Sequence, residues 1–123
     1  MQDFKHMRAW QRAHALAIAL HRLAGGFARA GHASLRAQLT RAADSISANI
    51  AEGCGAATRK EFARYLDVSI KSATETEHHL LSARDLDLVS PDDWQRFTAE
   101  TIEIRKMTYV YRRKILQSET RGR

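Results

Sequence analysis

The segment LRAQLTRAADSISANIAEG, residues 35–53, decides the fold of this chain. Its apolar side chains recur every three or four positions, at Leu35, Leu39, Ala42, Ile46 and Ile50. This is the period of an α-helix that buries one face. Ser34 can cap the start of such a helix, and Gly53, followed by Cys54 and Gly55, favours a left-handed exit at its end. We therefore predict a helix over residues 34–52.

Three further helices flank this segment. Apolar residues at helical spacing predict a first helix over about residues 5–29. Thr58-Arg59-Lys60-Glu61 has the form of a capping box and predicts a third helix over about residues 58–87. Ser90-Pro91 followed by two aspartates predicts a fourth over about residues 91–117, with a basic tail ending in Arg121 and Arg123. Because the connections are short, the predicted fold is a single all-α domain, an antiparallel up-down four-helix bundle.

The predicted fourth helix carries more apolar surface than one packing face requires. One stripe contains Phe97, Ile104, Tyr111 and Ile115. A second surface around the helix contains Trp94, Ile102, Tyr109 and Leu116. A helix that packs only within its own bundle needs an apolar arc of roughly 100°. The second surface is therefore our candidate interface for self-association or a partner protein, and cover by loops or by the N-terminal segment is the alternative.

The balance of charges favours an anionic partner. Twenty Lys and Arg against fourteen Asp and Glu give a net charge of +6. Nucleic acid, an acidic protein or a lipid surface would fit this charge, and a merely solvated basic surface is the alternative. The candidate nucleic-acid-binding residues are Arg59, Lys60, Arg64, Lys106, Arg113 and Lys114. Arg105 and Arg112 fall between the two apolar surfaces, so we expect each to pair with Glu75, Glu77 or an acid of a neighbouring subunit.

The sequence shows no pattern typical of an enzyme, a cofactor site or a membrane protein. Glu75-x-x-His78 is one half of a di-iron motif, and no second copy completes it, so we expect no metal. The lone Cys54 cannot form an intrachain disulfide. The longest apolar run, residues 15–20, is far below the ~20 residues that cross a bilayer. We expect a cytoplasmic protein without catalytic residues or a cofactor.

A resemblance to a known family rests on several motifs in order along the chain. The most specific is Arg41-Ala-Ala-x-Ser-Ile-x-x-Asn-Ile-Ala-Glu-Gly53, followed by Glu61-Phe62, Tyr65-Leu66 and Ser72-x-x-Glu75. The chain resembles the bacterial four-helix bundle family of S23, or 23S rRNA intervening-sequence, proteins. It departs from the usual pattern at Lys71 and Thr76, where the family commonly has Gly and Leu. The polar residues of the family motif are Arg41, Ser45, Asn49, Glu52, Gly53, Ser72 and Glu75.

The resemblance implies a small cytoplasmic protein that assembles into homopentameric rings. Some members are encoded within inserts of large-subunit ribosomal RNA genes, and the family has no established molecular activity. A distant relative, the accessory protein of diversity-generating retroelements, is thought to bind nucleic acid and a reverse transcriptase. We expect a non-enzymatic, self-associating bundle that binds RNA or DNA through its basic surface, with a protein scaffold as the alternative. The Ser45, Asn49 and Glu52 face is either a binding patch or a set of structural hydrogen bonds.

Overall fold

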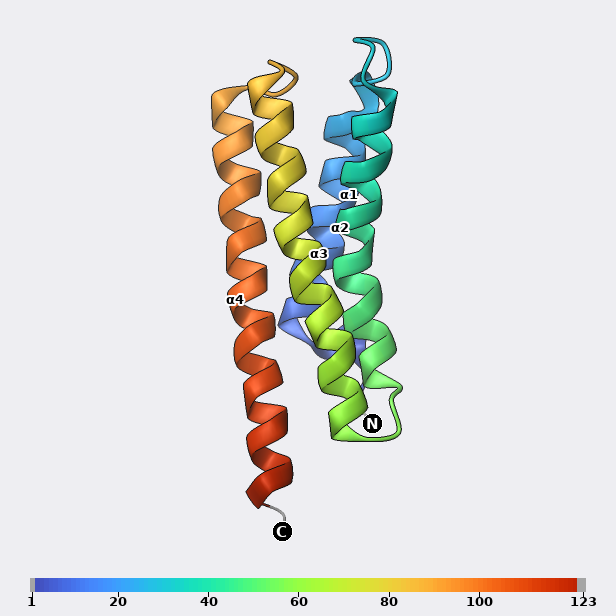
Figure 1. Cartoon of the computed structure of the whole chain (residues 1–123), viewed down its shortest axis with the longest axis vertical. Coiled ribbons are helices and arrows are strands. Elements are labelled where there is room, and N and C mark those ends of the chain that lie inside the picture. The colour runs from blue at the N-terminus through green and yellow to red at the C-terminus, as the bar shows by residue number, and fades with distance from the viewer. Residues whose placement is uncertain (1, 122–123) are drawn as a thin grey trace.

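The computed structural model describes the backbone of residues 2–121 and the side chains of residues 2–118. All of its regular structure is helical over that range. The elements are η1 (Phe4–His6), α1 (Arg8–Leu23), η2 (Ala24–Gly26), α2 (Ala33–Cys54), α3 (Arg59–Asp85) and α4 (Pro91–Arg121). The four long helices run alternately up and down (Figure 1), which confirms the predicted all-α four-helix bundle.

The first helix is shorter than the predicted 5–29. Met7 is extended, with φ −82° and ψ 126°, so a 3-10 turn precedes it and α1 begins only at Arg8. At the other end Gly25 and Gly26 form a second 3-10 turn, because paired glycines weaken an α-helix. Gly31, at φ +89°, then turns the chain toward α2.

The ends of α2 and α4 also differ from the predicted ones. Gly53 is not a left-handed exit: α2 continues through it to Cys54, and Gly55 follows at φ −91°. The fourth helix continues to Arg121, four residues past the expected end at 117, since no glycine or proline interrupts it. Gly122, Arg123 and the side chain of Arg121, which belong to the predicted basic tail, lie outside the described residues.

The core contains residues of all four long helices, and the predicted stripe of α2 lies at its centre. Leu39, Ile46 and Ile50 are fully buried, and Leu66 and Leu80 face them from α3. Small side chains bring these two helices together, and the Oγ atom of the buried Ser69 donates a hydrogen bond to the Ile46 carbonyl oxygen at 2.9 Å. The hydroxyl of the buried Thr76 donates a hydrogen bond to the Ser72 carbonyl oxygen at 2.8 Å. The core therefore accommodates threonine where the family commonly has leucine.

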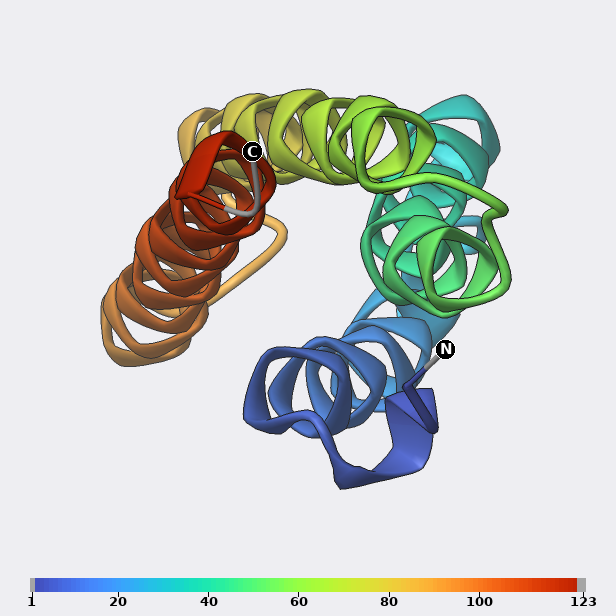
Figure 2. The same cartoon turned by 90° about the horizontal axis from the view of Figure 1, so that it is seen from below.

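The four helices form an open arc when seen along the bundle (Figure 2). Contacts are extensive between α2 and α3 and between α3 and α4, less so between α1 and α2, and sparsest between α1 and α4. A groove of about 580 Å³ lies along this last seam. Over the described residues, no helix is long and apolar enough to cross a membrane.

Candidate nucleic-acid interface

The start of α3 holds three of the six candidate nucleic-acid-binding residues. Thr58 caps the helix, since its Oγ1 accepts a hydrogen bond from the Glu61 amide at 3.1 Å, as the sequence predicts. Arg59 and Lys60 lie in the first turn and Arg64 one turn later. All three are exposed, and none has an ion-pair partner among the described side chains. The positive end of the helix dipole adds to their charge.

The far end of α4 brings a second basic cluster to the same end of the bundle. Because α3 and α4 are antiparallel, the C-terminal turns of α4 lie beside the start of α3 (Figure 1). The rings of Phe62 and Tyr111, 5.8 Å apart, mark this contact. Arg113 and Lys114 are exposed here and also lack an ion-pair partner within residues 2–118. Lys106, likewise exposed, lies two turns away, about 10 Å along the helix.

Two other arginines of α4 are held by acids of α3. Arg105 Nη1 lies 2.7 Å from Glu77 Oε1, which confirms the expected pairing with an acid of the third helix. Arg112 Nε lies 2.5 Å from Asp67 Oδ1. The expected pairing of Arg112 with Glu75, Glu77 or a neighbouring subunit is therefore wrong, because its partner is a different acid of the same α3 helix. The antiparallel register explains this, since it carries Arg112 toward the start of α3. These two charges stabilise the α3–α4 contact and are less free to meet phosphates.

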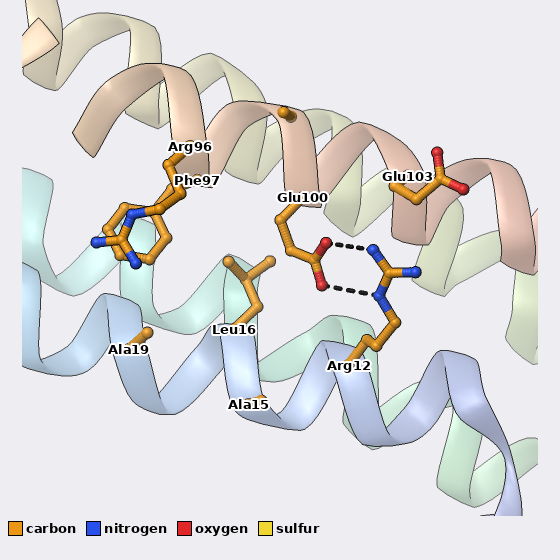
Figure 3. Close-up of a pocket in the computed structure, with 9 residues that line it drawn as sticks. Arg12, Ala15, Leu16, Ala19, Arg96, Phe97, Glu100 and Glu103 are labelled. Atoms are coloured by element: carbon orange, nitrogen blue, oxygen red, sulfur yellow. Dashed lines mark hydrogen bonds and ion pairs between the residues drawn. The ribbon is translucent and has the colours of Figure 1, made fainter. Parts of the chain in front are cut away.

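A third ion pair crosses the seam between α1 and α4. Arg12 donates two hydrogen bonds to the Glu100 carboxylate, one of them from Nε at 2.9 Å (Figure 3). The bond to Glu100 raises the pKa of the Arg12 guanidinium, against the opposing effect of burial. Leu16 and Phe97 line the groove on one side of this pair, and Glu103 lies on the other side. Sequence reasoning missed this pair, because Arg12 and Glu100 lie 88 residues apart with no pattern that links them.

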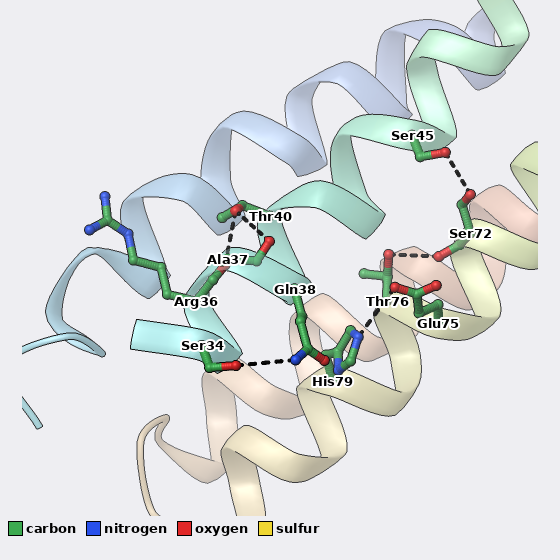
Figure 4. Close-up of polar contacts among 10 residues, drawn as sticks. All are labelled: Ser34, Arg36, Ala37, Gln38, Thr40, Ser45, Ser72, Glu75, Thr76 and His79. Atoms are coloured by element: carbon green, nitrogen blue, oxygen red, sulfur yellow. Dashed lines mark hydrogen bonds and ion pairs between the residues drawn. The ribbon is translucent and has the colours of Figure 1, made fainter. Parts of the chain in front are cut away.

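The polar family motif forms a hydrogen-bond network between α2 and α3. Ser45 Oγ accepts a hydrogen bond from Ser72 Oγ at 2.8 Å (Figure 4) and a second one from Asn49 Nδ2 at 2.9 Å. Asn49 Nδ2 also donates to the Ser45 carbonyl at 2.8 Å. All three residues are half-buried or buried. These bonds agree with the structural interpretation of Ser45 and Asn49, because such groups need partners when water is excluded.

The remaining motif residues do not join this network. Arg41 and Glu52 are exposed on α2, whereas Gly53 is buried against α3. Glu75 lies 3.3 Å from His79 Nε2, one turn along α3, rather than pairing with His78 (Figure 4). Across the described part of the chain, no three His, Cys, Asp or Glu side chains converge as a metal site would require.

The four candidate interface residues lie along α4 without forming one continuous exposed patch. Trp94 is half-buried, with the Arg84 guanidinium 4.6 Å from its ring centroid. Ile102 and Leu116 are half-buried as well. Tyr109 is 53% exposed and lies in a shallow apolar hollow on the outer side of α3 and α4. Apolar surface therefore does remain on α4 after the bundle has folded.

Fold and surface together define a small, basic, antiparallel four-helix bundle with a group of exposed cations at the end formed by α3 and α4. The chain belongs to the 23S rRNA-intervening sequence protein family, whose sequence model matches residues 5–110. It is also similar to a crystal structure from Bacteroides thetaiotaomicron, described as a protein with unknown function from the S23 ribosomal protein family. That likeness has a TM-score of 0.81 at 22% identity, covers 85% of this chain and 95% of the other, and supports the fold. No curated protein matches this chain significantly.

Proposed function

We propose that this chain is a non-enzymatic helical bundle that binds RNA or DNA through the basic end formed by α3 and α4. The supporting observation is that two clusters lie at the same end of the bundle, near the Phe62–Tyr111 contact. The start of α3 carries Arg59, Lys60 and Arg64, and the last turns of α4 carry Arg113 and Lys114. Their side chains are exposed and have no acidic partners among the described residues. Such a surface attracts the phosphate backbone without reading its sequence.

The salt dependence of RNA binding tests this proposal. A labelled RNA hairpin and a DNA duplex are titrated with the protein at several salt concentrations. The logarithm of affinity should fall linearly with the logarithm of salt concentration, by about 0.9 for each phosphate contacted on a duplex. Binding that is insensitive to salt would refute the proposal.

A pair of charge-matched variants locates the binding surface. Replacing Arg59, Lys60 and Arg64 by Gln removes three positive charges from the basic end. Replacing Arg22, Arg29 and Arg36 by Gln removes three from the opposite end, where these exposed residues flank the α1–α2 connection. We expect the first variant to lose affinity and to lower the salt slope by up to about 3, and the second to change little. Equal losses of affinity in the two variants would show that binding depends on the net charge of the protein and not on the basic end.

We also propose that the chain assembles into a ring, with five subunits as the expected number. The exposed apolar surface of α4 around Tyr109 and Val110, which are 53% and 36% exposed, supports self-association. A ring would multiply weak contacts between each basic end and one nucleic acid. Such a surface would equally serve the alternative, a scaffold for another protein.

Mass measurement tests the assembly. Tyr109→Glu should lower the molar mass seen by light scattering and leave the helical circular dichroism unchanged, because burying a carboxylate in an apolar contact is costly. Ile18→Glu is the matched control, since Ile18 is 41% exposed on α1. A Tyr109 variant with unchanged mass would exclude this surface as a subunit contact.

A further inference from the structure

A small pocket opens on the outer face of α2 and α3, beside the basic end. Its volume is about 250 Å³, which suits a single ring system better than a drug-sized ligand. The lining residues are Asn49, Glu61, Arg64, Tyr65 and Val68. Arg64 belongs both to this pocket and to the basic cluster at the start of α3, so a ligand could use the two together.

Asn49 presents a fixed hydrogen-bond acceptor. Its Nδ2 donates to the carbonyl oxygen and to the hydroxyl of Ser45, at 2.8 and 2.9 Å. Only the NH₂ group can donate to a carbonyl, so the orientation of the amide is settled. Its Oδ1 is left with no donor among the described residues.

Glu61 presents a second fixed acceptor. Its backbone amide donates to Thr58 Oγ1, and its Oε2 accepts a hydrogen bond from the Ala57 amide at 3.2 Å. These two bonds hold Glu61 in place in a variant of the capping box, in which the carboxylate bonds to the amide one residue before the N-cap. Its Oε1 has no donor within residues 2–118. The pocket therefore offers two positioned acceptors and one negative charge.

The other walls suit a flat ring next to a phosphate. Tyr65 is half-buried and packs partly against the core, so its ring is held in position. Val68 is 43% exposed and extends the apolar surface. Arg64 is exposed without an acidic partner among the described residues. An aromatic ring beside a free guanidinium is a combination that binds a base and its phosphate.

We propose that this pocket binds one unpaired base of the nucleic acid, with guanine preferred, while Arg64 contacts the adjoining phosphate. This inference rests on the proposed function. Guanine carries two neighbouring donors: its N2 amino group matches the open Oε1 of Glu61, and its N1–H matches the Oδ1 of Asn49. Adenine and cytosine place a ring acceptor next to their amino group, and uracil places carbonyls on both sides of its N–H. A carboxylate repels those acceptors.

An RNA hairpin with one unpaired guanine tests the pocket. The same hairpin is prepared with inosine, which lacks only the N2 amino group, and with an abasic site at that position. We expect the abasic hairpin to bind about 5- to 100-fold more weakly because stacking is lost. Inosine should bind about 2- to 10-fold more weakly because one hydrogen bond is lost.

Two variants assign the effect to the pocket. Glu61→Gln keeps the cap, since glutamine serves a capping box as well as glutamate, but it replaces one carboxylate oxygen by NH₂. We expect it to abolish the preference for guanine over inosine. Glu52→Gln is the matched control: it removes the same charge from an exposed acid outside the pocket, and the preference should persist.

Each other outcome has a distinct meaning. Equal, salt-dependent binding of the guanine, inosine and abasic hairpins would overturn the proposal that the pocket binds a base, and would leave the basic end as the binding surface. Absence of binding to every hairpin would overturn the proposed function and the pocket together. A change in assembly mass on Glu61→Gln, with the base preference retained, would show that the pocket is a contact between subunits and would overturn its role in base binding.

Discussion

Replacement of Gly53 by alanine tests how closely α2 and α3 approach. A Cβ atom built at Gly53 would lie 2.7 Å from Phe62 Cδ1, 2.9 Å from Phe62 Cε1 and 3.2 Å from Tyr65 Cβ. Ordinary contacts to a Cβ begin near 3.4 Å, so the Phe62 ring would have to move by several tenths of an ångström. Phe62 is only 4% exposed and contacts the Tyr111 ring on α4, so it has little room to move.

The magnitude follows from two opposed contributions. Inserting a methyl group into a packed core typically costs about 1–3 kcal/mol. Alanine in place of glycine stabilises a helix by up to about 1 kcal/mol, and by less in the last turn, where Gly53 lies. The clash involves a buried ring rather than the tip of a flexible chain, so the packing cost dominates. We expect the free energy of unfolding to fall by about 1–2 kcal/mol.

Urea denaturation followed by circular dichroism, at one fixed protein concentration, measures this change. The thermal midpoint should fall by about 4–8 °C. Gly55→Ala is the control, because a Cβ there would meet only the Glu52 carbonyl at 3.5 Å and the backbone φ of −91° suits alanine. It should be neutral or stabilise by up to about 1 kcal/mol. A Gly53→Ala protein as stable as the Gly55→Ala protein would refute the close approach.

Two further predictions concern Cys54 and the α1–α4 seam. Burial, with a smaller contribution from Asp3, raises the pKa of the Cys54 thiol, so the folded protein should react with a disulfide reagent at pH 8 far more slowly than the unfolded chain. Because the thiol of the unfolded chain ionises at a lower pH, the free energy of unfolding should also fall as pH rises above about 8.5, and Cys54→Ala should remove that part of the fall. Similar reaction rates of the thiol in the folded and unfolded states would contradict the burial of Cys54. Arg12→Met should lower the free energy of unfolding by at most about 1 kcal/mol, since both partners are about one-third exposed, and 0.5 M NaCl should shrink the difference. A larger loss that salt does not affect would assign the role of Arg12 to packing.

The helices could be predicted from sequence because their signals are local. The apolar period of residues 35–53, the Thr58 cap and the Ser90-Pro91 start each act within one or two turns. Thr58 and Ser90 do cap their helices, accepting hydrogen bonds from the amides three residues later. The partner of each ion pair depends instead on the relative axial position of two packed helices, which no local sequence pattern encodes.

Gly53 shows why a local signal can mislead. A glycine after an apolar stripe is a common helix end, and that interpretation predicted a left-handed exit. In the structure the residue is helical, and its missing side chain admits Phe62 and Tyr65 of the next helix. The requirement comes from tertiary packing, so it becomes visible only when α3 is in place.

The basic end illustrates the same limit for the candidate site. The six cations could be named from sequence because charged residues off an apolar stripe face solvent. Their position at one end depends on the antiparallel return of α4, which brings its last turns to the start of α3, where Tyr111 contacts Phe62. The pocket next to Arg64 gave no sequence signal of its own, since Asn49 belongs to α2 and Tyr65 to α3.

The open arc of Figure 2 has a mechanical consequence. Three of its four neighbouring helix pairs are joined by broad packing, whereas α1 and α4 make few contacts. The polar links on that side include the Arg12–Glu100 ion pair and the hydrogen bond from Tyr111 to Gln2, which precedes α1. The α1–α2 and α3–α4 hairpins are therefore held together mainly by the packing of α2 against α3. Loss of the few α1–α4 contacts would leave α1 held by α2 alone, while the α2–α3 and α3–α4 packing persists. Transient opening should therefore begin at the α1–α4 edge.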